Sequence, residues 1–208
     1  MDLSELDKSV INTIDSIKYK TKTKTLKVSN KITIDWEGVL PEPPANTSEE
    51  TKKELGYLHL LTNNLTPENR GLVKLVDKEP LDLYKPIFEK MGKKLPLKEF
   101  KKANTILEPI IKNLKDKFNR PRPTGTHHTP AYPSGHTAYA AIAAYLFADM
   151  YPYYSSEFFK MIGLAGFARC LQGVHYPSDN EASMVITGAV WQDIRYKLFP
   201  ELEPYGSK

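Results

Sequence analysis

The stretch PLKEFKKANTILEPIIKNLKDKF, residues 96–118, carries apolar side chains at the spacing of an amphipathic α-helix. The residues of this apolar face are Leu97, Phe100, Leu107, Ile111, Leu114 and Phe118. Pro96 suits the first helical position, where the missing N–H of proline costs no hydrogen bond. The stretch therefore predicts a long helix that ends near residue 118 and packs one face on other elements of the fold.

Helical patterns continue on both sides of this stretch. Thr47-Ser48-Glu49-Glu50 resembles a capping box and opens a predicted helix that ends near Leu61. The other predicted helices span about 66–77, 80–92, 135–150, 155–169 and 177–198. Strong strand patterns are absent after residue 40. We therefore predict an all-α, single-domain helical bundle over residues 46–208.

Residues 1–45 differ in composition and are predicted to form a separate N-terminal arm. The segment Lys18–Lys31, KYKTKTKTLKVSNK, alternates lysine with threonine and contains no acidic residue. Ile32, Ile34 and Trp36 continue the alternation, which is compatible with a short β-hairpin or edge strand. Lysines on such an edge discourage pairing with other chains. The alternatives are an anchor for an anionic polymer or membrane surface, and an element of a homo-oligomer.

Composition limits the class of protein. A chain of 208 residues fits one domain with an arm, and a net charge of +4 is too small to predict a nucleic-acid partner. The single cysteine, Cys170, excludes an internal disulfide framework and a multi-cysteine zinc site. No apolar run approaches the ~18 residues of a membrane-spanning helix, and the first residues are acidic and polar, unlike a secretory signal. We therefore expect a soluble protein without a transmembrane anchor, cytoplasmic by default.

Two short segments combine positive charge with a helix terminus. In KDKFNRPRP, which begins at Lys115, that lysine lies at the edge of the apolar helix face, from which its ammonium can point into a pocket. Pro133-Ser-Gly-His136 runs directly into an alanine-rich helix. A helix N-terminus presents unpaired N–H groups to an anion, and Gly135 lets a ligand approach the backbone closely. Both segments predict an anion site.

The third segment, RCLQGVHYPSD, begins at Arg169. In it Asp179 follows His175 by four residues, a spacing that allows the carboxylate to accept a hydrogen bond from the imidazole and fix its tautomer. Together the three segments supply cations, a hydroxyl, backbone amides, two histidines and a carboxylate. This set suits the binding of a tetrahedral oxyanion and its transfer through a neutral histidine, with a second, protonated histidine as acid.

The three segments contain, in order, the motifs Lys-x6-Arg-Pro, Pro-Ser-Gly-His and Arg-x5-His-x3-Asp. Together these motifs resemble the signature of the type 2 phosphatidic-acid phosphatase and vanadium haloperoxidase superfamily. That superfamily includes soluble bacterial non-specific acid phosphatases, membrane lipid phosphatases and haloperoxidases. The resemblance spans Lys115 to Asp179 and implies the family's helical core over about 47–198. The turn LPEPP at residues 40–44 is similar to the soluble acid phosphatases in particular.

The resemblance implies a role for each motif residue. His175 would be the nucleophile that forms a phosphohistidine, Asp179 would orient it, and His136 would be the general acid and later the base. The phosphate-binding residues would be Lys115, Arg122, Ser134, Gly135 and Arg169. The phosphatase chemistry implies no metal and no cofactor, whereas the haloperoxidases hold vanadate in the same pocket.

Three departures from the family pattern affect the prediction. Ala168 replaces the serine that usually precedes the arginine, and the gap between Pro123 and Pro133 is short, which predicts that a substrate-covering loop is missing. Asn-Glu-Ala-Ser after Asp179 is more polar than in the membrane enzymes and favours the soluble branch.

The predicted function is that of a soluble, metal-independent acid phosphatase acting on a small phosphorylated substrate. The alternatives are a vanadate-dependent haloperoxidase, whose chains are usually much longer, and a lipid-phosphate or pyrophosphate phosphatase. An idle anion-binding protein is a further alternative, which the intact catalytic set argues against. The leaving group stays open, as do the roles of Arg120, which either binds substrate or lies at the surface, and of His127 and His128.

Overall fold

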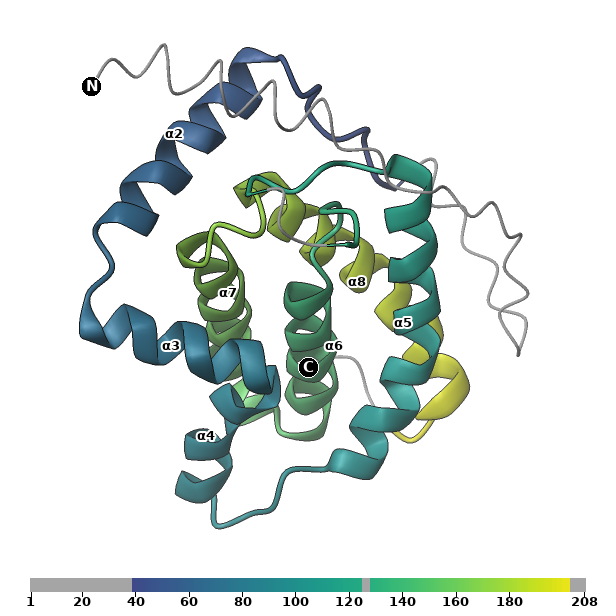
Figure 1. Cartoon of the computed structure of the whole chain (residues 1–208). Coiled ribbons are helices and arrows are strands. Elements are labelled where there is room, and N and C mark those ends of the chain that lie inside the picture. Colours follow the sequence, from purple (N-terminus) through teal and green to yellow (C-terminus); the bar gives the residue numbers. More distant parts are fainter. Residues whose placement is uncertain (1–38, 125–127, 203–208) are drawn as a thin grey trace.

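The computed structural model describes residues 39–124 and 128–202, and all regular elements within these ranges are helices (Figure 1). They are α2 (Glu49–Asn63), α3 (Pro67–Lys78), the 3₁₀ turn η1 (Pro80–Tyr84), α4 (Lys85–Lys90), α5 (Leu97–Phe118), α6 (Gly135–Met150), the 3₁₀ turn η2 (Pro152–Tyr154), α7 (Ser155–Leu171) and α8 (Pro177–Leu198). The all-α prediction is confirmed. The lysine-rich segment and the hairpin predicted at 18–36 lie outside the described residues.

Helix α6 is the central element of the fold, and α5, α7 and α8 pack around it (Figure 1). A helix that is apolar on all sides belongs in a core, and α6 is almost completely buried. Its small side chains leave room for three neighbouring helices. The buried alanines are Ala138, Ala140, Ala141, Ala143, Ala144 and Ala148.

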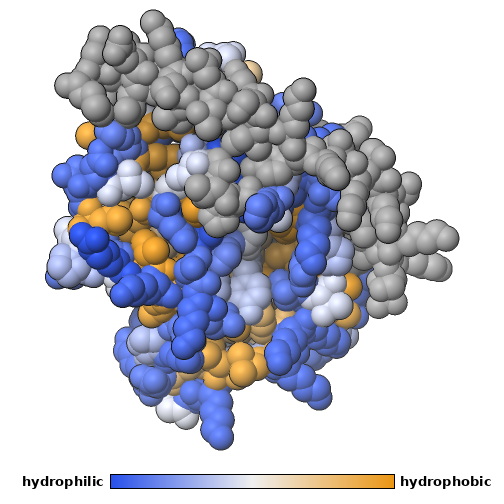
Figure 2. Space-filling view, viewed as in Figure 1, coloured by the Kyte–Doolittle hydropathy of each residue, from blue (hydrophilic) through white to orange (hydrophobic). Residues whose placement is uncertain are grey.

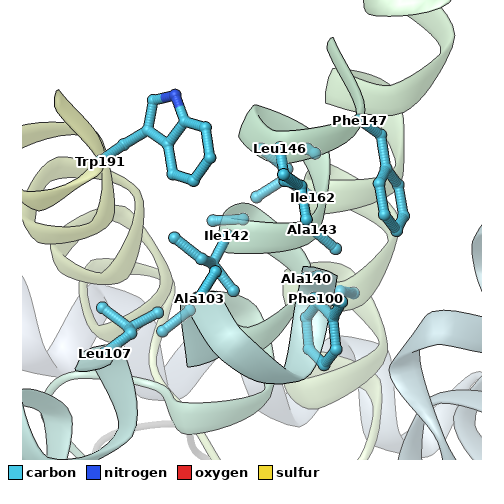
Figure 3. Packing of buried hydrophobic residues seen from close by; sticks show 14 of the residues in the cluster. Phe100, Ala103, Leu107, Ala140, Ile142, Ala143, Leu146, Phe147, Ile162 and Trp191 are labelled. Carbon is cyan, nitrogen blue, oxygen red and sulfur yellow. The ribbon is translucent and has the colours of Figure 1, made fainter. Parts of the chain in front are cut away.

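Side chains from four helices interlock in the core (Figure 3). This buried cluster includes Phe100 and Leu107 of α5, Ile142 and Leu146 of α6 and Ile162 of α7. Each such buried side chain stabilises the fold by about 1.5–3 kcal/mol. Trp191 of α8 also lies in this core, and its indole Nε1 donates to the buried Oδ2 of Asp149 over 2.9 Å. The indole is therefore buried without an unpaired donor.

Two helix starts differ from the sequence predictions. Ser48, not Thr47, caps α2, because its hydroxyl accepts from the Thr51 amide over 3.2 Å. Pro96 is the N-cap of α5 and not its first helical residue, and Leu97 is 47% exposed rather than part of the buried face. The residues that complete the buried face instead are Ala103, Ile106 and Ile110.

The single helix predicted at 80–92 is in fact two elements, η1 and α4. Pro86 lies in the first turn of α4, where the missing amide hydrogen of proline breaks no hydrogen bond of that helix. The other predicted bounds agree to within about two residues, the usual uncertainty of helix ends.

Among the helices of residues 39–124 and 128–202, none combines the length and apolar character that a membrane crossing needs. On the face shown in Figure 2, apolar residues form separate patches among hydrophilic ones.

Candidate active site

The three motif segments meet where α5 and α7 end and where α6 and α8 begin. Backbone hydrogen bonds join the segments directly. The Ala131 amide donates to the Arg120 carbonyl over 2.8 Å, and the Ser134 amide donates to the Asp179 carbonyl over 3.0 Å. The fold therefore brings together residues that lie up to 64 positions apart between Lys115 and Asp179.

His175 is buried at the centre of the site, with 1% of its surface exposed. Its Nδ1 lies 3.1 Å from Oδ2 of Asp179, and its Nε2 lies 3.0 Å from Nη1 of Arg122. A guanidinium can only donate, so Nε2 accepts and the ring proton is on Nδ1. Nε2 therefore directs a lone pair towards the cationic side of the site.

Asp179 is completely buried in the first turn of α8. Oδ2 also accepts from the Tyr176 amide over 2.9 Å, and Oδ1 accepts from Arg120 Nη1 over 2.7 Å. Burial raises the pKa of Asp179, and Arg120 and the Tyr176 amide oppose this rise. The carboxylate is fixed from three directions, one of which is the imidazole.

Lys115 points inward, as its place on the α5 face predicted. Its ammonium donates to the carbonyls of Pro130 over 2.6 Å and Ala131 over 3.1 Å. A Cβ added to Gly135 would meet Cε of Lys115 at 3.9 Å, so the lysine lies beside the start of α6. Burial and Arg122 lower the pKa of Lys115 to about 7.

Arg122 is buried, and backbone groups orient its guanidinium. Nε donates to the Thr129 carbonyl over 2.9 Å, and Nη1 donates to the Val174 carbonyl over 3.0 Å. Arg169, at the end of α7, donates from Nη1 to Oδ1 of Asp77 over 2.7 Å. Both guanidinium groups are therefore held in place by protein acceptors.

His136 lies in the first turn of α6 and is partly exposed. Burial, followed by the charge of Arg169, lowers its pKa to about 4, while Asp77 opposes this through its carboxylate and its backbone carbonyl. The pKa of His175 lies well below its ordinary value, first because of burial and then because of the charges of Lys115, Arg122 and Arg169. Near pH 7 both imidazoles are neutral.

Ser134 is completely buried before the first turn of α6. Its Oγ lies 2.9 Å from Oγ1 of Thr137, which in turn donates to Oδ1 of Asn180 over 2.8 Å. Because the Thr137 proton is used there, the Ser134 hydroxyl is the donor to Thr137. A phosphate bound here would take this hydroxyl as a donor only after the hydroxyl turns away from Thr137. The α6 amides that follow Gly135 supply further donors.

The sequence analysis did not single out two acidic residues that hold charged side chains of the site. Asp77 pairs with Arg169, and Glu54 of α2 accepts from Arg120 over 2.9 Å. Arg120, whose role was left open, is 2% exposed and is therefore no surface residue. Neither Asp77 nor Glu54 belongs to a motif or to a spacing pattern, so only the folded chain reveals these contacts.

The sequence left open the roles of two adjacent histidines, His127 and His128. His128 is exposed, and His127 lies outside the described residues. Cys170 is buried among apolar neighbours. Within residues 39–124 and 128–202, no three His, Cys, Asp or Glu side chains converge as metal ligands would.

A cavity of about 340 Å³ adjoins His136. Its lining residues are Glu79, Pro80, Gly135, His136 and Tyr139. Burial, followed by the charge and hydrogen bond of the Glu79 carboxylate, raises the pKa of Tyr139 to about 12. Space for a second chemical group therefore exists on the His136 side of the site.

Comparisons with known proteins show what this chain is similar to. A search of curated proteins finds no match. Among solved structures, the chain is similar to the "first transmembrane PAP2 type phosphatidylglycerolphosphate phosphatase" from Bacillus subtilis, at 18% identity and a TM-score of 0.49 over 73% of this chain and 86% of that chain. The narrower likeness to soluble acid phosphatases stays a prediction. The family model of the PAP2 superfamily matches residues 103–201. This matched segment, about half of the chain, holds all three motifs.

Proposed function

We propose that this protein is a phosphatase that hydrolyses phosphate monoesters through a phosphohistidine formed on His175. One observation carries the proposal. The Nδ1 proton of His175 is held by Asp179, and its Nε2 lone pair faces Arg122 in a pocket that Lys115 and Arg169 also make positive. A neutral imidazole beside several cations suits attack on a bound phosphoryl group.

The proposed first step transfers the phosphoryl group to His175. Its Nε2 forms a bond to phosphorus while the bond from phosphorus to the ester oxygen breaks, and the leaving oxygen takes a proton from His136. The Asp179 carboxylate stabilises the positive imidazole, whose Nδ1–H it accepts. Arg122 Nη1, which contacts Nε2 in this structure, instead contacts a phosphoryl oxygen.

The second step regenerates the enzyme. Water attacks phosphorus, His136 accepts a proton from that water, and the N–P bond breaks so that the electron pair returns to Nε2 of His175. The products are inorganic phosphate and the alcohol released in the first step. The cations stabilise the developing charge in both steps.

The cavity beside His136 supports a class of leaving group. The proposed acid must lie next to the leaving oxygen, so the rest of the leaving group extends into the cavity. The Glu79 carboxylate lines this space and repels a second negative charge. We therefore propose a small, uncharged or cationic leaving group with hydroxyl or amine donors, and poor turnover of pyrophosphate.

Glu79→Gln is expected to improve turnover of pyrophosphate about three- to tenfold in kcat/KM relative to a neutral sugar phosphate, because one repulsive charge is removed. Glutamine keeps an oxygen for the Leu81 amide, which now donates to Glu79 Oε1 over 3.2 Å. Glu157→Gln, which removes the exposed partner of Lys90, is the matched control and is expected to leave the ratio unchanged. An unchanged ratio in Glu79→Gln contradicts the assignment of this cavity.

The proposed function itself is tested by a panel of phosphate esters, assayed beside halide oxidation with peroxide and vanadate. We expect phosphate release that persists in chelator and is inhibited by orthovanadate, because vanadate adopts a geometry similar to that of the phosphoryl-transfer transition state. Halide oxidation faster than phosphate release would contradict the proposal. So would an activity that chelator abolishes and a divalent metal restores.

A further inference from the structure

A buried network connects the His175–Asp179 pair to helix α2. Arg120 is its centre: Nη1 donates to Oδ1 of Asp179 over 2.7 Å, and Nη2 donates to Oε2 of Glu54 over 2.9 Å. The side chains of Arg120, Glu54 and Asp179 are 1%, 10% and 0% exposed. The three charges therefore interact with little screening by water.

Glu54 binds both Arg120 and the start of α8. Its Oε1 accepts from the Ser178 amide over 2.7 Å, and its Oε2 accepts from the Ser178 hydroxyl over 3.0 Å. The Arg120 guanidinium also lies 3.8 Å from the centre of the Tyr176 ring. These contacts leave the guanidinium one orientation, in which Nη1 points at Asp179.

The consequence for Asp179 is a fixed rotation of its carboxylate. Arg120 occupies Oδ1, so Oδ2 remains for the Nδ1 proton of His175 and for the Tyr176 amide. Arg120 also opposes protonation of this completely buried carboxyl. A protonated Asp179 would accept the imidazole proton poorly and would not stabilise a positive His175.

We propose that Arg120, braced by Glu54, is a positioning residue that keeps Asp179 ionised and directed at His175. The inference rests on the proposed function of His175 and deepens it by adding a residue of α2 to the site. Arg120 itself contacts neither the nucleophile nor, in this account, the phosphate.

Other titratable groups also surround the His175–Asp179 pair. The cations or potential cations that act on His175 are Lys115, Arg122, Arg169 and His136. The uncharged groups are Tyr132, Cys170 and Tyr176, and burial raises the pKa of both Tyr132 and Cys170 to about 12. None of these residues is changed in the experiment below, so a difference between variants reports on Arg120 and Glu54.

Because Arg120 and Glu54 carry opposite charges, their removal is expected to shift proton uptake by the His175–Asp179 pair in opposite directions. Arg120→Gln removes a positive charge and is expected to raise the pH at which the His175–Asp179 pair takes up a proton, by about one unit. Glu54→Gln removes a negative charge and is expected to lower that pH by about half a unit or more. This pH is the midpoint of the titration. A loss of packing alone does not explain a higher midpoint in one variant and a lower midpoint in the other.

The measurement follows the ring nitrogen resonances of His175 against pH in the full-length protein without substrate. The same variants are then compared by the acidic limb of kcat/KM with one phosphate ester. Arg120→Lys keeps the positive charge, so the pH of its acidic limb is expected to lie close to that of the wild type. Its kcat is expected to stay reduced, because a lysine lacks the planar, two-pronged guanidinium of arginine. Arg195→Gln, which removes a partly buried arginine of α8 that donates to the Leu202 carbonyl, is the control and is expected to leave the midpoint unchanged.

Opposite shifts in Arg120→Gln and Glu54→Gln support the inference, and shifts of the same sign or no shift overturn it. If Arg120→Gln does not fold, Glu54→Gln decides alone: a lower midpoint supports the inference, and an unchanged one overturns it. The resonance measurement needs no turnover. A chain that releases no phosphate therefore contradicts the proposed function without deciding this inference.

Discussion

His175→Ala is expected to reduce phosphate release by a factor on the order of 10⁴ or more, because it removes the nucleophile and with it the covalent route. Asp179 retains Arg120 and the Tyr176 amide as donors in this variant, so its carboxylate stays paired. We therefore expect a folded protein, checked by circular dichroism and thermal unfolding, whose kcat for a phosphate ester falls to background.

The matched control is His59→Ala on α2, whose imidazole forms a hydrogen bond only with Asn63 among the side-chain hydrogen bonds found in residues 39–124 and 128–202. It is expected to retain wild-type turnover. Substantial phosphate release by a folded His175→Ala would show that another group attacks phosphorus.

His136→Ala is expected to lower kcat for an alkyl phosphate by about 10²–10⁴-fold, the usual contribution of a general acid. An alkoxide leaves poorly without a proton, whereas a nitrophenolate leaves without help. We therefore expect a much smaller loss with an aryl phosphate. The measurement is kcat for the two esters in each variant, with His128→Ala as the control for an exposed histidine in the same region. A loss that depends on the leaving group in His128→Ala, and not in His136→Ala, would transfer the role of acid to His128.

The same pair of variants tests the pH dependence. The pKa of His136 is about 4, so above that value its protonated form becomes scarcer by about tenfold per pH unit. Activity that needs this proton is present at acidic pH and is lost as the pH rises. A bound phosphate dianion raises the pKa of His136, so the alkaline limb of kcat lies at higher pH than that of kcat/KM. His136→Ala is expected to lose this limb, and its persistence would contradict the assignment.

Most of the fold could be predicted from periodicity. The apolar faces of α5 and the alanine-rich run of α6 define helices whose bounds the sequence indicates to within about two residues. The failures are local. The helix predicted at 80–92 is divided into η1 and α4, and Pro86 lies in the first turn of α4. Leu97 falls outside the buried face because α5 begins at that residue. Capping and proline geometry at helix ends depend on the tertiary contacts of each end, which no spacing pattern contains.

Only the motif residues of the site could be predicted from the sequence. Lys115, Arg122, Arg169, His175 and Asp179 come together because the ends of α5 and α7 meet the starts of α6 and α8. The partners that hold them are unpredictable from the chain. Glu54 lies on α2, 66 residues before Arg120 and 124 before Ser178, and no local pattern relates them.

Ser134 is the clearest difference between motif and geometry. The motif implies that Ser134 donates a hydrogen bond to phosphate. In this structure its hydroxyl instead donates to Thr137, in a series of hydrogen bonds that ends at Asn180. The donor-to-acceptor direction of these hydrogen bonds depends on Asn180, one residue after the motif. Its amide nitrogen donates to the Gly166 carbonyl over 3.2 Å, which leaves its Oδ1 to accept from Thr137.

The central claim is that phosphate is carried on His175, and a single-turnover quench tests it most directly. The enzyme is mixed with less than one equivalent of a phosphate ester labelled on phosphorus and quenched within milliseconds into alkaline denaturant, in which an N–P bond survives. Mass spectrometry of the digested protein then locates the label. We predict transient label on the peptide that contains His175, none in His175→Ala, and longer-lived label in His136→Ala. Label on any other residue, or complete release of phosphate with no labelled protein at any time, would contradict the account.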